Sequence, residues 1–389
     1  GTGVFAANTQ ISSITNGTQF VVSTAPTTPL AAGAVVSNST SMMEYGYGLF
    51  KLSVTDGAQN NTIQNCTITL NKLNNLPSTL PMAEGSTGII VANSTANAAA
   101  SPLVPTAATG SNSNNKFYTN TIQNCNHGIS LNGYSAPSPY TLGDTGNDVG
   151  GGSALTGNNI LNFGGGASVP IIQAAAAIRA NFQWAVNIAF NTIDNNTGAG
   201  INHLGVLRGI YGQAGAGASA TIRSNTIAVK SAATAANTCT GIENNIGNAG
   251  VGNTLIISDN TVTGTNTAGA PINAWIGISN TATGTATNIN MNGNIVENAS
   301  LAGAGAWTGI SNLAPTTNLS MSNNILRNCT ITSTGTFTGI SNVGAVTTSN
   351  MSGNTVSGNT KAATATVNWL NSSGTATTSF INNNTIFNN

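Results

Sequence analysis

The chain has 389 residues and a formal net charge of zero, with 9 Lys or Arg and 9 Asp or Glu, so only 5% of its residues are charged. Soluble domains average about 25% charged residues, and a neutral chain has no long-range field that attracts nucleic acid or anionic membranes. No run approaches the ~18–20 apolar residues of a membrane helix, and a hydrophobic content of 40% argues against disorder.

Residues 1–44 carry three strand-like pieces, at Gln10–Ile14, Thr18–Ser23 and Ala34–Ser37. Aromatic, β-branched and Thr residues are enriched in these pieces, as is typical of strands. We therefore predict a β-rich N-terminal cap or docking segment over 1–44.

From residue 45 onward a short motif recurs ten times, namely Asn, then Thr or Ile, then an aliphatic residue. Between Asn191 and Asn384 successive motifs start 30–35 residues apart. Two independent features recur with the motif: a large apolar residue three positions before the Asn, and a Gly–aliphatic pair farther upstream. The third positions define a predicted core ladder of Ile63, Ile122, Leu161, Ile193, Ile227, Val262, Val296, Leu326, Val356 and Ile386.

The composition of each repeat indicates strands, because Thr, Ile, Val and Asn alternate with period two, as in Asn288–Asn292. A propeller blade needs roughly 40 or more residues, whereas three short parallel strands fit into 30. We predict an all-β chain in which 45–389 form a right-handed parallel β-helix of about ten coils, with loop insertions near 91–115 and 133–155. Identical positions then stack about 4.8 Å apart, which favours Asn and Thr over like charges.

The motifs NTIQNC (61–66 and 120–125), FNTIDNN (190–196) and TGIS (308–311 and 338–341) suggest a family resemblance. With them the chain resembles right-handed β-helix repeat proteins of bacterial surfaces, in particular the large Asn/Thr-rich proteins that Bacteroidetes-type bacteria export by the type IX system. The resemblance implies an exported protein at the cell surface or outside the cell.

Carboxylates that could act as catalysts are sparse. Asp194 and Glu297 share a column three coils apart, roughly 14 Å, beyond the ~5–9.5 Å that separates paired glycosidase carboxylates. His127 and His203 have no acid or thiol at a repeat-equivalent position, and we interpret both as corner residues. We predict a protein that is not an enzyme and needs no cofactor; the alternative is a glycan-binding or polysaccharide-degrading β-helix similar to pectate lyases.

An acidic segment and a pair of cysteines are two further candidate sites. Asp144 and Asp148, in LGDTGNDVGGG, have the oxygen ligands of a Ca²⁺ site, although Asp-Gly segments more often form turns. Cys66 and Cys125 fall in one column of the predicted repeat, where a disulfide or two stacked free thiols would fit.

An aromatic column of Trp275, Trp307 and Phe337 lies three residues before the aliphatic residue of the Gly–aliphatic pair. Pleat alternation favours its exposure, as on a glycan-binding strip, whereas the other interpretation is a stacked ladder that stabilises the solenoid.

The last coil gains aromatic residues, which predicts a self-assembly surface. Trp369 stands where Gly is usual, and Phe387 takes a position held by polar residues elsewhere. We predict that Trp369, Phe380, Phe387 and Asn389 contact another protein element, preferably residues 1–44 of the next identical chain in a head-to-tail filament. Neighbouring domains of a longer surface protein, or glycans, are the other expected partners.

Overall fold

In the computed structural model, residues 11–16, 19–22, 45–71, 85–99, 101–165, 174–195, 203–232, 237–248, 252–266, 274–362 and 364–389 are described. The chain divides into two compact units, Gly1–Met42 and Met43–Asn389. In the first unit, β1 (Ile11–Asn16) pairs antiparallel with β2 (Gln19–Val22). The strand predicted at Ala34–Ser37 lies outside the described residues.

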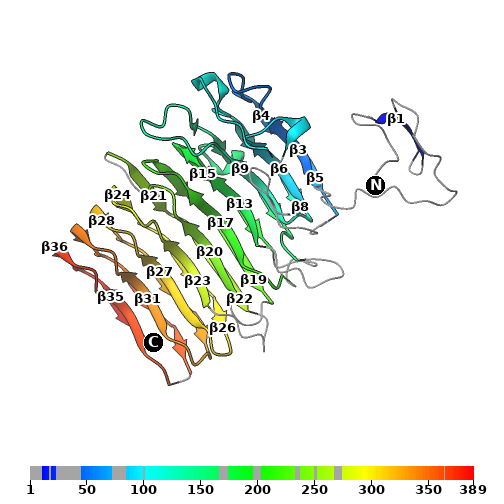
Figure 1. Cartoon of the computed structure of the whole chain (residues 1–389). Coiled ribbons are helices and arrows are strands. Elements are labelled where there is room, and N and C mark those ends of the chain that lie inside the picture. Colours follow the sequence, from blue (N-terminus) through cyan, green and yellow to red (C-terminus); the bar gives the residue numbers. More distant parts are fainter. Residues whose placement is uncertain are drawn as a thin grey trace. The chain divides into compact units, whose positions relative to one another are not determined.

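The second unit consists of three parallel sheets, which the chain visits in turn (Figure 1). The first sheet contains β3 (Tyr45–Phe50), β6 (Thr87–Ala92), β9 (His127–Asn132), β13 (Ala175–Asn181), β17 (Leu207–Ala214), β20 (Thr238–Asn244), β23 (Ala274–Asn280), β27 (Ala306–Asn312), β31 (Phe337–Asn342) and β35 (Val367–Ser372). The second contains β4 (Thr62–Gln64), β7 (Lys116–Tyr118), β11 (Asp148–Val149), β15 (Val186–Ala189), β18 (Ala220–Arg223), β21 (Thr254–Ser258), β24 (Ala286–Asn290), β28 (Thr316–Ser320), β32 (Val346–Asn350) and β36 (Ala376–Phe380).

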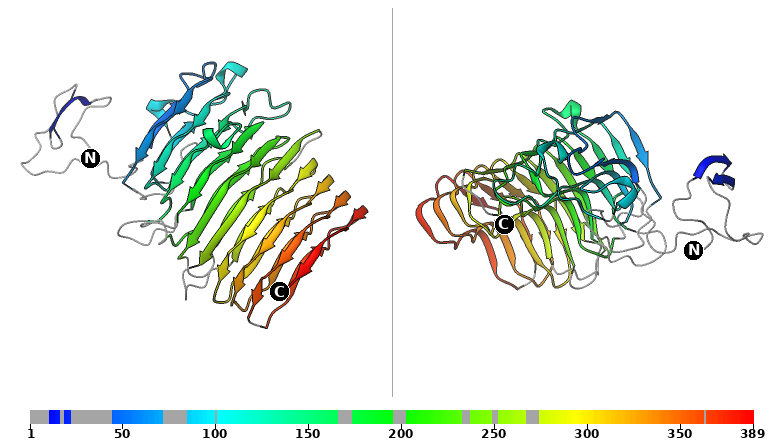
Figure 2. Two further views of the ribbon diagram at one scale, coloured as in Figure 1. Left: turned by 180° about the vertical axis from the view of Figure 1, so that it is seen from behind. Right: turned by 45° about the horizontal axis from the view of Figure 1, so that its top comes forward.

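The third sheet contains β5 (Thr67–Thr69), β8 (Thr121–Gln123), β12 (Asn159–Leu161), β16 (Thr192–Asp194), β19 (Thr226–Ser231), β22 (Thr261–Asn266), β25 (Ile295–Glu297), β29 (Ile325–Arg327), β33 (Thr355–Ser357) and β37 (Thr385–Phe387), with β26 (Ser300–Leu301), β30 (Thr330–Ile331) and β34 (Thr360–Lys361) beside them. One strand of each sheet makes one coil, and the coils follow one another from blue to red in Figure 2. The prediction of an all-β parallel β-helix is confirmed.

The described helices are three 3₁₀ turns: η1 (Ala96–Ala98), η2 (Ala108–Gly110) and η3 (Ala154–Thr156). Among the described residues no helix has the length and apolarity to cross a membrane. The predicted insertions are only partly loops. Val91 and Ala92 belong to β6, and 133–155 contain β11 as well as β10 (Asp144–Thr145), which pairs with β14 (Gln183–Trp184).

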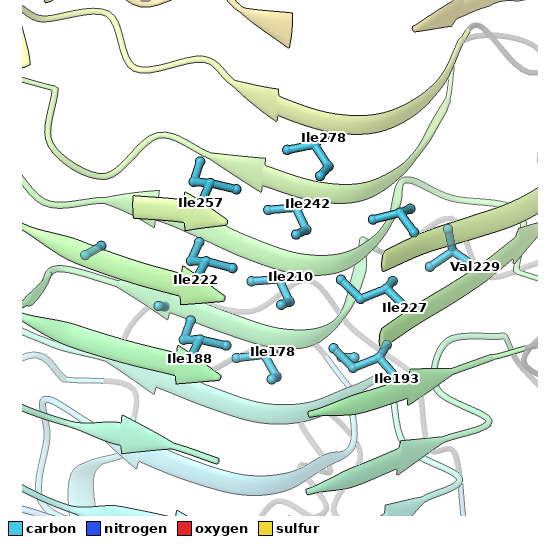
Figure 3. Close-up of a cluster of buried hydrophobic side chains, with 14 of the residues drawn as sticks. Ile178, Ile188, Ile193, Ile210, Ile222, Ile227, Val229, Ile242, Ile257 and Ile278 are labelled. Atoms are coloured by element: carbon cyan, nitrogen blue, oxygen red, sulfur yellow. The ribbon is translucent and has the colours of Figure 1, made fainter. Parts of the chain in front are cut away.

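Aliphatic side chains stack in columns inside the coils (Figure 3). Ile178, Ile210, Ile242 and Ile278 pair consecutively in the first sheet and are fully buried. Figure 3 shows the parallel columns that the second and third sheets contribute, which include Ile188–Ile222–Ile257 and Ile193–Ile227. Because side chains of one kind lie above one another, each coil supplies the apolar contacts of the next.

The predicted core ladder is wrong at two positions. Ile63 pairs with Phe117 in the second sheet, and Ile68 is the residue that pairs with Ile122. Leu161 is one residue out of register with the ladder, because Ile160 is the residue that pairs with both Ile122 and Ile193. The observed ladder is Ile68, Ile122, Ile160, Ile193, Ile227, Val262, Val296, Leu326, Val356 and Ile386.

A ladder of buried asparagines runs along one corner of the coils. In each but the last, the backbone N–H and the side-chain Nδ2 donate to the Oδ1 of the next asparagine, at 3.1 and 3.0 Å for Asn225 to Asn260. The other Nδ2 hydrogen of Asn225 is donated to the Ile188 carbonyl oxygen of the preceding coil, at 2.9 Å. The members are Asn120, Asn158, Asn191, Asn225, Asn260, Asn294, Asn324, Asn354 and Asn384. Asparagine suits this position because it has two side-chain donors and an oxygen with two lone pairs.

Glycines that face the core let neighbouring strands of the first sheet approach closely. A Cβ on Gly277 would lie 2.5 Å from the Gly309 carbonyl oxygen and 2.9 Å from the side chain of Val296. No side chain fits there, which explains the Gly–aliphatic pair of the repeat.

Candidate functional site

The aromatic column does not form an exposed strip. Trp275, Trp307 and Phe337 stack in register, with ring centroids 5.5 and 4.7 Å apart, and all three are 0% exposed. The expectation of glycan-facing aromatics at these positions is therefore wrong. The reason is a break in the pleat: both Gly277 and Ile278 are buried in β23, so the residues before Gly277 face the opposite way from what simple alternation predicts.

Cys66 and Cys125 do not share a column, so neither of the two arrangements considered from the sequence, a disulfide or a pair of stacked thiols, is present. The backbone N–H of Cys66 donates to Asn120 Oδ1 at 3.1 Å, which places Cys66 beside Asn120. The four cysteines, all within the described ranges, form no disulfide. The two identical NTIQNC segments are out of register by five residues. The first lies in β4 of the second sheet, whereas the other lies in β8 of the third.

Asp144 and Asp148 do not form a Ca²⁺ site together. Asp144 is fully buried, with Oδ1 3.8 Å from Lys51 Nζ, and burial raises its pKa to about 6. Asp148 accepts hydrogen bonds from Tyr118 Oη (2.6 Å), Asn187 Nδ2 (2.7 Å) and the Gly151 N–H (3.0 Å). Within the part of the chain that the structure describes, no group of three or more His, Cys, Asp or Glu could hold a metal ion.

The other two carboxylates singled out in the sequence lie apart from each other. Asp194 is in β16 and Glu297 in β25, three strands along the third sheet. Glu297 pairs with Arg327 of the next strand, at 2.6 Å. The pair lies at the surface, where such contacts contribute little to stability.

A basic pocket lies on the outer face of the first sheet, over β9, β13 and β17, which are side by side in Figure 1. It encloses about 200 Å³ and is lined by His127, Ala174, Ala175, Ala176, Arg179, Arg208, Tyr211 and Gln213. Ala176 pairs with His127 on one side and with Arg208 on the other, so its small side chain leaves the hollow between them.

The polar side chains of the basic pocket are held by specific contacts. Arg208 donates to both carboxylate oxygens of Glu243, at 2.6 and 3.4 Å, and its Cζ lies 4.0 Å from the Tyr211 ring centroid. Arg179 Nε donates to Gln213 Oε1 at 2.7 Å. Burial raises the pKa of Tyr211, so its phenol keeps its proton and remains a donor.

Sequence reasoning missed the basic pocket, although a signal for it exists. Two outward columns of the first sheet carry Thr87, Thr240, Thr308 and Thr338 in one, and Ser130, Ser279, Ser311 and Ser341 in the other. His127, Ala176 and Arg208 interrupt the Thr column, and Arg179, Tyr211 and Glu243 interrupt the Ser column. Other departures occur in these columns, such as Ile276 and Ile90, but the ones that carry a charge, an imidazole or a phenol are clustered in adjacent coils.

The last coil forms a second candidate surface, the C-terminal face, consisting of Trp369, Phe380, Ile381, Ile386 and Phe387. Phe380 and Phe387 are 49% and 48% exposed. They pair with Asn350 and Ser357 of the preceding coil, so aromatic residues stand in polar outward columns. Trp369 packs edge-on against Phe337, with centroids 4.6 Å apart.

Comparisons with protein-family models, with curated proteins and with solved structures found no match. The basic pocket and the C-terminal face are therefore the features that bear on function.

The buried imidazole of the basic pocket predicts a specific pH dependence. Burial, with a further contribution from Arg179, lowers the pKa of His127 from 6.5 to about 3; His203 and Arg208 act in the same direction. The unfolded chain then binds a proton that the folded chain does not, so stability falls as pH drops from 6.5 towards 3, by about 1.4 kcal/mol per pH unit. His127→Thr should remove this slope, as measured by urea denaturation between pH 7 and 4. An unchanged slope in the variant would contradict the assignment.

Proposed function

We propose that this protein is an extracellular structural or adhesive component of a cell surface, a right-handed β-helix of about ten coils that assembles head to tail. The right-handed sense is that of nearly all parallel β-crossovers. The observation that carries the proposal is the pair Phe380 and Phe387, which expose aromatic rings where the preceding coil has Asn350 and Ser357. Placement outside the cell is supported by the resemblance to surface repeat proteins. No catalytic role is proposed.

Exposed aromatic residues favour burial against another protein surface. Ile381 and Ile386 lie next to the two Phe residues and are also about half-exposed, at 48% and 47%. Together they form one apolar end surface, and contiguous surfaces of this kind mark interaction sites.

The asparagine ladder gives the association a direction. Each ladder asparagine from Asn120 to Asn354 donates to the asparagine of the following coil, so the donors of the ladder all point towards the C-terminal face. Asn389 continues a shorter ladder from Asn359 in the same sense. If two C-terminal faces met, hydrogen-bond donors of one ladder would face donors of the other. If a C-terminal face met an N-terminal end, the donors would face acceptors. The proposed occupant is therefore the N-terminal part of a second copy, residues 1–44 with the adjoining strand β3, whose Tyr45 and Tyr47 are exposed.

The double variant Phe380→Asn/Phe387→Ser restores the residues of the preceding coil and should abolish assembly. We expect association at least about tenfold weaker, because aromatic residues dominate such contacts, with unchanged circular dichroism. The measurement is sedimentation velocity over a concentration series, with electron microscopy of the same samples.

A matched control removes apolar surface elsewhere. Leu155→Thr/Leu313→Thr replaces side chains that are 87% and 48% exposed and lie in coils that do not pair with the last one. This control should assemble like the wild type. A wild-type chain that stays monomeric at high concentration, or a control that loses assembly equally, would refute the proposal.

A further inference from the structure

We propose that the basic pocket binds a small carboxylate, with the two guanidinium groups of Arg179 and Arg208 receiving the anion. The inference is independent of head-to-tail assembly, because the pocket lies on the outer face of the first sheet, over β9, β13 and β17.

The repeat itself supplies the comparison that singles out the pocket. Thr and Ser are the most frequent residues of the same two outward columns in the other coils, for example Thr308 and Ser311. A solenoid needs no arginine or tyrosine at these positions in order to fold. Their appearance together in β13 and β17, in a chain with only 9 Lys or Arg, indicates a local function.

A β-bulge completes the lining. Ala180 pairs with Gly212 and Asn181 with Ala214, so Gln213 is an extra residue in β17. Its side-chain oxygen accepts a hydrogen bond from Arg179 Nε. Bulges re-aim side chains beside functional sites, and here the bulge fixes the orientation of a guanidinium group.

The chemistry of the lining favours a monoanion. The lining residues contain two guanidinium groups and no carboxylate. Glu243 holds Arg208 from the adjacent strand β20, so the charges of Arg179, Arg208 and Glu243 sum to +1 (2 − 1). Guanidinium groups bind carboxylates through charge-assisted hydrogen bonds, and the Tyr211 phenol is a neutral donor beside them. A single carboxylate neutralises the net charge of the cluster, whereas a dianion would leave it with a net negative charge.

The size of the hollow limits the ligand. A volume of about 200 Å³ lies below the range of about 300–1,000 Å³ typical of pockets for drug-sized ligands. The ligand class is therefore a small hydroxy acid, up to the size of an open-chain sugar acid.

The test is isothermal titration calorimetry of the full chain with D-gluconate and with lactate. Sorbitol, which replaces the carboxylate of gluconate by a hydroxymethyl group, is the neutral control, and inorganic phosphate tests a non-carboxylate oxyanion. Binding of at least one acid, with no binding of sorbitol and weaker binding of phosphate, is expected. No heat with either acid, equal binding of sorbitol, or tighter binding of phosphate would overturn the proposal.

Two variants locate the ligand. Arg179→Gln should weaken binding at least about tenfold through loss of one charge-assisted contact. Ala176→Thr installs the residue of the same column in other coils, keeps every charge and fills the hollow, so it should abolish binding. The control is Arg327→Gln, which removes an arginine with a similar partner, Glu297 at 2.6 Å, outside the pocket. Wild-type affinity in Ala176→Thr, or an equal loss in Arg327→Gln, would exclude the pocket as the site.

Discussion

Replacing Asn225 by Asp is expected to lower the free energy of unfolding by about 4 kcal/mol or more. Asn225 is buried and donates two side-chain hydrogen bonds, to Asn260 Oδ1 at 3.0 Å and to the Ile188 carbonyl oxygen at 2.9 Å. A carboxylate can donate neither bond, and it places a buried negative charge against two oxygens that were acceptors. The midpoint of urea denaturation, followed by circular dichroism, measures the loss.

The control for this prediction is Asn318→Asp at an exposed position. Asn318 Nδ2 donates to Asn288 Oδ1 at 3.0 Å, so it also bonds to an asparagine of a neighbouring coil, but in contact with water. Its substitution should change stability by about 0.5 kcal/mol or less. Similar losses of unfolding free energy in the two variants would contradict the expectation that burial makes the ladder asparagines important for stability.

The class of fold is readable from the sequence because a solenoid repeats its own contacts. Between Asn191 and Asn384 the motifs are 30–35 residues apart, so counting residues is enough to find neighbours such as Val262 and Val296. The composition carries the same information, since a buried column of identical positions accepts asparagine but not like charges.

The register of the strands cannot be predicted where one coil contains two similar motifs. In the first coil Asn61-Thr62-Ile63 and Cys66-Thr67-Ile68 both have the form of the repeat, and they belong to the second and third sheets. At 158–161 two consecutive asparagines offer two starting points, and only Asn158 joins the ladder. Local sequence cannot choose between such alternatives, because the choice depends on which strand supplies the hydrogen-bond partner.

The basic pocket shows a different limit. The departures of Arg179 and Arg208 from the repeat are visible in the sequence, but their meeting depends on a hollow over Ala176 and on a bulge at Gln213. A bulge changes which side of the strand a residue faces without a fixed sequence signature. The burial of Trp275 has a similar cause, since the bend at Gly277 reverses the alternation on which its predicted exposure was based.

Val262→Asp is expected to destabilise the solenoid by about 4 kcal/mol or more. Val262 is fully buried and pairs with Ile227 and Val296 in the third sheet. Its side chain fills the space that Gly241 leaves open, where an added Cβ would clash with Val262 Cγ1. A carboxylate there is buried beside Ile227 and Val296 in the apolar core, so it loses its hydration. Urea denaturation gives the change in midpoint.

The matched control lies one residue away in the same strand. Thr263 is only partly buried, so Thr263→Asp adds the same charge on the outer face of β22 and should cost about 1 kcal/mol or less. Because coils contact only their neighbours, damage from Val262→Asp should spread to the strands on either side before it reaches the ends. Hydrogen exchange should therefore show the first loss of protection in β19, β22 and β25. Uniform loss along the chain, or equal costs for the two substitutions, would contradict an inward-facing Val262 in a solenoid stabilised coil by coil.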